Sequence, residues 1–309
     1  MPMKFGAQLW SQQTTWQQFR DTALRAEDVG WDSAWTWDHL LAIFGPWEQP
    51  ILEGWTTLAG VAALTSRVRL GLMVGANTFR NPGVTTKLAT TLNHISGGRA
   101  ILGIGGAWFE REHDGYGIDF GSGFGERLDR LDESVRLMRR LLDGERFSHD
   151  GPIYPMHDAL AAPRPIQPHL PIMIGGSGPT KTLRTLARYG DMWNAGGSLE
   201  QLRTKDATMR ERCAEIGRDP ETVEKTVSVD LILRDTREAA LARYAEIATL
   251  GGFEADVDDA PHVGTPEQVA DSLRPMIELG FRHILVDLPA PYDAETIDRI
   301  GEVLELLRA

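Results

Sequence analysis

The sequence has 309 residues, of which 42% are hydrophobic and 25% charged, and this balance is typical of a globular chain with one large or two ordinary domains. The formal net charge of −12 argues against a nucleic-acid-binding protein, because contacts to phosphates require clustered Lys and Arg side chains. The sequence has neither a long uncharged apolar run nor a signal peptide at Met1 to Trp10, so we expect a cytoplasmic protein that does not bind membranes. The single cysteine, Cys213, lies in a charged helical segment and is expected to have no chemical role.

Short apolar runs alternate with longer amphipathic segments along the chain, which indicates repeated βα units. The expected strands cover residues 4–9, 33–37, 68–74, 100–104, 171–174, 192–194, 223–233 and 283–287. The expected helices cover about residues 15–29, 53–64, a segment that opens at Pro82, 124–142, 180–189, 199–216, 237–250, 266–279 and 294–307. A Gly- and Pro-rich insertion at about 143–168 contains HDGPIYP, which resembles a hairpin turn.

This alternation predicts an α/β fold, either a closed (β/α)8 TIM barrel or an open doubly wound sheet. The number of βα units and the lack of a linker favour one barrel domain over residues 1–309, with the insertion before strand five. In a barrel, functional residues follow the strands at one mouth. The candidates are then residues 8–11, 37–39, 74–78, 105–112, 175–178 and 194–197.

The first of two glycine clusters ends the apolar run of AILGIGGAWFERE, residues 100–112. A dinucleotide-binding fingerprint requires a small residue three places after Gly105, and Trp108 stands there instead. We therefore interpret Gly105 and Gly106 as a strand end where a planar ligand approaches the backbone.

The second cluster, in IMIGGSGPTKT, places Gly175, Gly176, Ser177 and Gly178 between a strand and a helix. Free N–H groups at a helix N-terminus bind anions, and the ammonium of Lys181 would strengthen such a site. The spacing does not match a Walker A loop. The alternative is a tight strand-to-helix turn that binds no ligand.

Five segments, in order, resemble the luciferase-like flavin and deazaflavin oxidoreductases. They are SAWTWDHL, RLGLMVGANTFRNP, ISGGRAILGIGGAWFEREHDGYGI, PIMIGGSGPTKTLRTLARYGDMWN and GTPEQVADSLRPMIELGFRHILV, and the resemblance runs from residue 4 to about 288. The chain is most similar to the branch that uses the deazaflavin coenzyme F420. The resemblance implies a TIM barrel, hydride transfer between F420 and a small organic substrate, and a homodimer.

The resemblance also implies roles for individual residues. Asp38 and His39 match an acidic-His pair beside the reactive ring carbon, and Met73–Val74 matches a non-prolyl cis peptide that backs the ring. The other residues that the resemblance assigns to the cofactor line the ring's polar edge and substrate side (Asn77, Thr78, Gly105, Gly106, Ala107) or form the phosphate cradle (Gly176, Ser177, Gly178, Thr182). Gly175, just before the cradle, is also assigned to cofactor binding.

Imidazole titrates near neutral pH, so His39 is suited to donate or accept a proton, and Asp38 could fix its tautomer. The alternative is a buried structural histidine. Family members that oxidise sugar phosphates carry a proton-donating glutamate where Trp108 stands, which argues against that reaction. Glu110 and Glu112 are expected to be solvated loop charges or helix caps.

Trp10, Trp37, Trp47 and Trp108 are expected to wall a substrate pocket, whereas Trp35 and Trp55 are assigned to the core. No spacing of His residues suggests a metal site. Two alternatives share the fold: an FMN-dependent two-component monooxygenase, and a non-catalytic flavin-binding protein. The acidic net charge of the protein disfavours binding of the anionic tail of F420. A local basic cluster could compensate for this charge, formed by Arg80, Arg111, Lys181 and Arg184.

Overall fold

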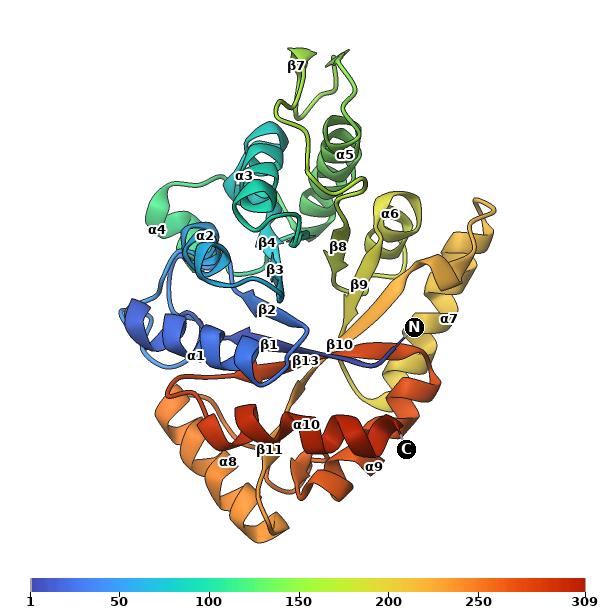
Figure 1. Ribbon diagram of the computed structural model, residues 1–309. Helices are drawn as coiled ribbons and strands as arrows, with labels where there is room; N and C mark the ends of the chain where they lie inside the picture. Colours follow the sequence, from blue (N-terminus) through green and yellow to red (C-terminus); the bar gives the residue numbers. More distant parts are fainter. Residues whose placement is uncertain (1, 309) are drawn as a thin grey trace.

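Parallel strands form a closed barrel at the centre of the computed structural model, which describes residues 2–308, and helices surround this barrel (Figure 1). Within that range the barrel strands are β1 (Lys4–Leu9), β2 (Ser33–Thr36), β3 (Arg69–Leu72), β5 (Ala100–Gly105), β8 (Ile172–Gly175), β9 (Met192–Ala195), β10 (Glu224–Asp230) and β13 (Phe281–Leu288). Pairing of β1 with β13 and of β3 with β5 closes the ring. The expected TIM barrel is confirmed, and an open sheet is excluded.

Strand side chains alternate between two apolar environments, which is why the strands read as continuous apolar runs. Inward-facing residues fill the barrel interior, among them Trp35, Ile101 and Met173. Their outward neighbours pack against the helices. Trp35 and Trp55 are both buried, as expected for core residues.

Several helices begin where the sequence supplies capping residues. Thr15, Ser198 and Thr265 each form a capping box, and Pro82 occupies the first turn of its helix. The helices are α1 (Trp16–Asp28), α2 (Gly54–Leu64), α3 (Pro82–Ile95), α4 (Glu110–Tyr116), α5 (Phe124–Leu142), α6 (Thr182–Tyr189), α7 (Leu199–Ala214), α8 (Arg237–Gly251), α9 (Pro266–Glu278) and α10 (Ala294–Arg308). No helix in the described range is long and apolar enough to cross a membrane.

The insertion forms an antiparallel hairpin of β6 (Phe147–His149) and β7 (Met156–Ala159), which projects at the top of Figure 1. Its apolar side chains, Phe147 and Met156, pack with Leu137 and Leu141 of α5. Three short elements were not expected: α4, the strand β4 (Gly75–Ala76) and the strand β12 (Val263–Gly264), which pairs with β11 (Ile232–Leu233). The strand expected at 223–233 divides into β10 and β11. α4 follows β5 and supplies a side chain to the candidate site.

Candidate active site

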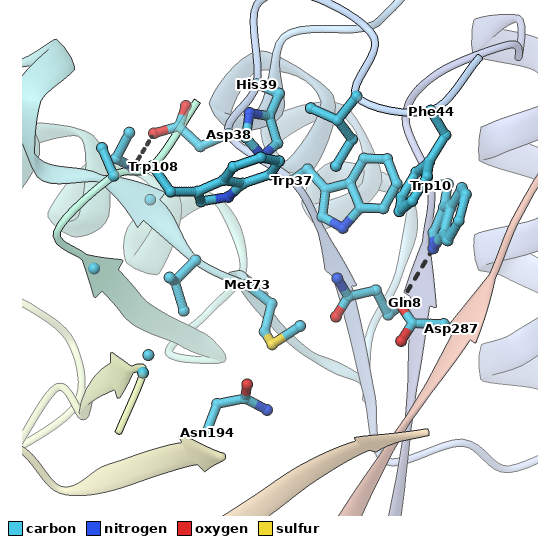
Figure 2. A pocket seen from close by; sticks show the side chains of 18 of the residues that line it. Gln8, Trp10, Trp37, Asp38, His39, Phe44, Met73, Trp108, Asn194 and Asp287 are labelled. Carbon is cyan, nitrogen blue, oxygen red and sulfur yellow. Dashed lines mark hydrogen bonds between the residues drawn. The ribbon is translucent and has the colours of Figure 1, made fainter. Parts of the chain in front are cut away.

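A cavity of about 650 Å³ lies at the carboxyl ends of the barrel strands (Figure 2). Twelve of the residues expected to form the site line it: Trp10, Trp37, Asp38, His39, Met73, Val74, Gly105, Gly106, Ala107, Trp108, Gly175 and Gly176. These residues come from different βα units, and the closed barrel brings them together. The volume is suitable for a planar cofactor and a small second molecule.

His39 follows β2 and is held by a carboxylate from α4. Its Nδ1 lies 3.0 and 3.2 Å from the two carboxylate oxygens of Glu112, and the backbone N–H of Leu40 donates to Glu112 at 2.9 Å. A carboxylate only accepts hydrogen bonds, so Nδ1 carries the proton and Nε2 is left as the accepting nitrogen. Glu112 is 1% exposed in its side chain, so the expectation of a solvated or capping charge is wrong for Glu112. Glu110 is exposed in the first turn of α4.

Asp38 does not orient His39, which corrects the expectation that it fixes the histidine tautomer. Its carboxylate accepts two hydrogen bonds from Arg80, at 2.7 and 2.9 Å, and one from the Ala76 N–H at 2.8 Å. Arg80 also donates to Glu53 at 3.1 Å. Asp38 and His39 both lie in the segment that follows β2, and their side chains reach different partners. Asp38 thereby joins β2 to β4, and Arg80 is not free to bind a cofactor tail.

The Met73–Val74 peptide is cis, and Val74 lies against the ends of β5 and β8. A Cβ at Gly105 would lie 2.8 Å from a Val74 methyl carbon, and one at Gly175 would lie 2.7 Å from it. A Cβ at Gly103 would lie 1.9 Å from the Leu72 carbonyl oxygen. The glycines therefore admit Val74 and the backbone of the third strand, which is a different reason from the ligand approach expected at Gly105.

The second glycine cluster leads from β8 into α6, and two hydrogen bonds hold Gly176 in place. The Gly176 N–H donates to the Asn194 carbonyl at 3.2 Å, and the Trp193 indole donates to the Gly176 carbonyl at 2.9 Å. Ser177, Gly178 and Thr182 are not among the described residues that line the cavity. Lys181 does not supply a free ammonium, because it pairs with Asp129 at 2.7 Å. No side chain caps the α6 N-terminus in the described chain.

Three further residues lie away from the cavity lining, against expectation. Asn77 is buried and donates to the Tyr154 hydroxyl at 3.3 Å. Thr78 hydrogen-bonds His113 Nε2 at 2.7 Å. The guanidinium carbon of Arg111 lies 4.2 Å from the centroid of the Trp47 ring. Neither Trp47 nor Arg111 is among the described residues that line the cavity.

Aromatic rings line the end of the cavity that lies away from Met73. Trp10 stacks on Phe44 with ring centroids 4.6 Å apart, and it also contacts Trp37 and Phe253. Trp108 lies at the rim, 61% exposed, with its ring centroid 5.5 Å from that of His39. Figure 2 shows Trp10 and Phe44 on the side of the cavity away from Met73.

Four polar residues that line the cavity were missed among the proposed site residues. Gln8 and Asn194 fall within the strand-end ranges but received no role, and Asp230 and Asp287 end β10 and β13. The carboxyl ends of the last two strands were not considered as candidates, although the same barrel rule applies to them. Among the described residues, no group of three or more His, Cys, Asp and Glu side chains is arranged to hold a metal ion.

Comparisons with known proteins identify relatives over the whole chain. Residues 1–262 match the family model of the luciferase-like monooxygenases. A protein of Kineococcus radiotolerans named F420-dependent glucose-6-phosphate dehydrogenase is 30% identical over 99% of this chain and 98% of its own. The barrel superposes on an F420-dependent secondary alcohol dehydrogenase in complex with an F420-acetone adduct, with a TM-score of 0.85, 20% identity and full coverage of both chains. It also superposes on the FMN complex of a type II Baeyer-Villiger monooxygenase of Pseudomonas putida, with a TM-score of 0.77, 21% identity and 99% coverage of both chains.

Proposed function

The chain belongs to the luciferase-like monooxygenase family, and we propose that it is an oxidoreductase that transfers a hydride between coenzyme F420 and a small organic substrate. The choice of F420 is supported by the full-length relative named as an F420-dependent dehydrogenase. One observation of the site carries the catalytic part of the proposal: a histidine at the cavity is held by a buried carboxylate in one tautomer.

The residues present fit a planar cofactor with a phosphate group. Val74 and the glycines of β5 and β8 make a wall with few protruding side chains, against which a flat ring can lie. A Cβ added at Gly176 would meet only Thr182, at 3.6 Å, so the backbone there is open to a ligand. The uncapped N-terminus of α6 follows this loop, and its N–H groups are suited to a phosphate oxygen.

In this proposal the deazaflavin ring supplies the hydride chemistry, and the protein supplies orientation and a proton path. Glu112 holds the His39 ring through Nδ1, so that Nε2 accepts a proton from the substrate in one direction of the reaction and returns it in the other. Asp38 has a positioning role: by holding Ala76 and Arg80 it keeps the segment after β3, which includes Val74, in place. Trp37 and Trp108 flank His39 and restrict water around it.

Cofactor choice tests the proposal most directly. We expect the purified protein to bind F420 about tenfold more tightly than FMN, a difference of about 1.4 kcal/mol. Fluorescence titration of one preparation with both cofactors measures this preference. A clear preference for FMN would instead support the two-component monooxygenase alternative.

We also propose a cytoplasmic homodimer, which the family resemblance supports. Size-exclusion chromatography with light scattering, over a range of protein concentrations, measures the assembly. A mass equal to that of one chain at every concentration would contradict the dimer.

A further inference from the structure

The substrate end of the cavity contains a row of polar side chains on three neighbouring strands. Gln8 of β1 is the register partner of Asp287 of β13, and Asp287 is the register partner of Asp230 of β10. Side chains in matching register of a parallel sheet point to the same side. All three residues line the cavity, and Figure 2 shows Gln8 and Asp287 below the rings of Trp10 and Phe44.

Gln8 carries unused hydrogen-bonding capacity at this position. It is 1% exposed, and neither its amide nitrogen nor its amide oxygen has a partner within the described chain. A buried amide without partners destabilises the folded protein, so the presence of Gln8 at a cavity wall indicates that a group binds there. The amide offers a donor and an acceptor together.

The carboxyl groups of Asp287 and Asp230 each accept a hydrogen bond on one of their two oxygens. Asp287 accepts a hydrogen bond from the Trp10 indole at 3.2 Å, and Asp230 accepts one from the Tyr244 hydroxyl at 2.9 Å. The second oxygen of each carboxyl has no hydrogen-bond partner among the described residues. Glu254 adds a third acidic group at this end, and the described residues that line the cavity include no Lys or Arg.

From this row and the aromatic wall above it, we infer that Gln8, Asp230 and Asp287 form a recognition subsite for a hydroxyl or ammonium group on the substrate, and that the subsite rejects phosphate. A hydroxyl group satisfies the Gln8 amide and donates to a carboxyl, and an ammonium group pairs with the carboxylates and lies against aromatic faces. A phosphate would face three acidic groups without a compensating cation, and like charges at close range are unfavourable. The substrate would then differ from the sugar phosphate in the name of the full-length relatives.

This inference rests on the proposed function, because the subsite is the substrate end of the same cavity. Three probes share one apolar body and differ only in the polar group: benzyl alcohol, benzylamine and benzyl phosphate. Each is titrated by ligand-detected NMR at pH 8, with saturating inorganic phosphate present to occupy any anion site at the glycine loop. The proteins are the wild type, Gln8→Leu, Asp287→Asn and a control, Gln17→Leu, at an exposed position of α1.

We expect the alcohol and the amine to bind the wild type about tenfold more tightly than the phosphate. Both should lose about fivefold in affinity in Gln8→Leu and none in Gln17→Leu. In Asp287→Asn the amine should lose affinity relative to the alcohol, because the variant removes a charge but keeps the size of the side chain. Melting temperatures confirm that each variant is folded.

Two results would overturn the inference: equal affinity for all three probes in the wild type, or binding of the alcohol and amine that is unchanged in both folded variants of the subsite. F420 titration of the same preparations separates the two proposals. Absence of F420 binding with the expected probe pattern would contradict only the proposed function. F420 binding with a failed probe pattern would contradict only the subsite.

Discussion

At the scale of single residues, the site depends on how each buried polar atom is satisfied. The Glu112 carboxylate receives hydrogen bonds from His39 and from the Leu40 N–H, so both the ring and the backbone next to it are fixed. Asp38, the neighbour of His39 in the chain, is fully engaged by Arg80 and Ala76. We therefore assign the proposed proton transfer to the His39–Glu112 pair and a positioning role to Asp38.

Substitutions of this pair test its role. His39→Asn should keep F420 affinity within a few fold but lower the rate of hydride transfer by ~10²–10⁴, the usual contribution of general acid–base catalysis. Glu112→Gln should lower the rate of hydride transfer by about tenfold or more. The amide N–H of the new side chain can face Nδ1 of His39 and favour the tautomer that carries its proton on Nε2. Single-turnover absorbance of the deazaflavin measures the rate. The matched control is Glu110→Gln, an exposed glutamate in the same helix, which should have no effect. Normal hydride transfer by a less stable Glu112→Gln protein would show that the pair is structural.

Asp287 gives a pH-dependent prediction about stability. Burial, together with the nearby Asp230, raises the pKa of Asp287 to about 7. Between about pH 4 and 7 the folded protein then holds a proton that the unfolded chain has lost, so stability falls as the pH rises, by at most about 4 kcal/mol. Asp287→Asn removes the titrating carboxyl, so the variant should not lose this stability as the pH rises. Its melting temperature should exceed that of the wild type by more at pH 8 than at pH 5, whereas Asp271→Asn, at an exposed side chain, should show no such trend. A constant difference across this range would contradict the raised pKa.

At the scale of the elements, the strand ends are shaped by glycines for two separate reasons. Gly103, Gly105 and Gly175 leave room for the backbone and side chain of the third strand at Leu72 and Val74. Gly176 instead has a φ of +102°, a conformation that glycine adopts readily and other residues rarely do. Of these glycines, only Gly176 faces open space at the position proposed for the cofactor phosphate.

Gly176→Ala therefore tests the phosphate loop. Gly30, which ends the segment after α1, has a φ of +104° and nothing within 4 Å of an added Cβ, so Gly30→Ala carries the same backbone strain far from the cavity. Both variants should lose about 1–2 kcal/mol of stability. Only Gly176→Ala should also weaken F420 binding, by about tenfold or more, in the fluorescence titration. Equal F420 affinities in the two variants would place the phosphate elsewhere.

The predictable elements are those with strong local signals. The helical spacing of apolar residues predicted a helix at about residues 124–142, where α5 covers Phe124–Leu142, and apolar runs located each barrel strand. α4 was missed because seven residues are too short to show a helical period. The Asp38–Arg80 and His39–Glu112 pairs join residues 42 and 73 positions apart, and no local pattern specifies such contacts. The subsite at Asp230 and Asp287 was missed for a different reason, because the strand-end rule was not applied to the last two strands.

At the scale of the whole molecule, the barrel is tied together where its last units meet. Asp293 precedes α10 and accepts hydrogen bonds from Arg234 at 2.7 and 2.9 Å and from Arg243 of α8 at 2.9 Å. It also accepts a hydrogen bond from the Thr296 N–H at 3.1 Å, in the first turn of α10. One carboxylate thus connects β11, α8 and α10 on the side of the barrel closed by β13.

The stability of this junction should depend on pH in the opposite sense to that of Asp287. Burial alone would raise the pKa of Asp293, but the hydrogen bonds from Arg234, Thr296 and Arg243 and the charge of Arg234 lower it to about 2. A lowered pKa contributes stability above the unfolded value of about 4, and that contribution is lost as the pH falls toward 2. Asp293→Asn should therefore cost about 2 kcal/mol at pH 7 and about half of that at pH 3. Urea denaturation at the two pH values measures the difference, with Asp235→Asn as the control, since Asp235 is 90% exposed and its pair with Arg299 should contribute little. A loss of equal size at both pH values would mean that Asp293 acts through packing and hydrogen-bond geometry and not through its charge.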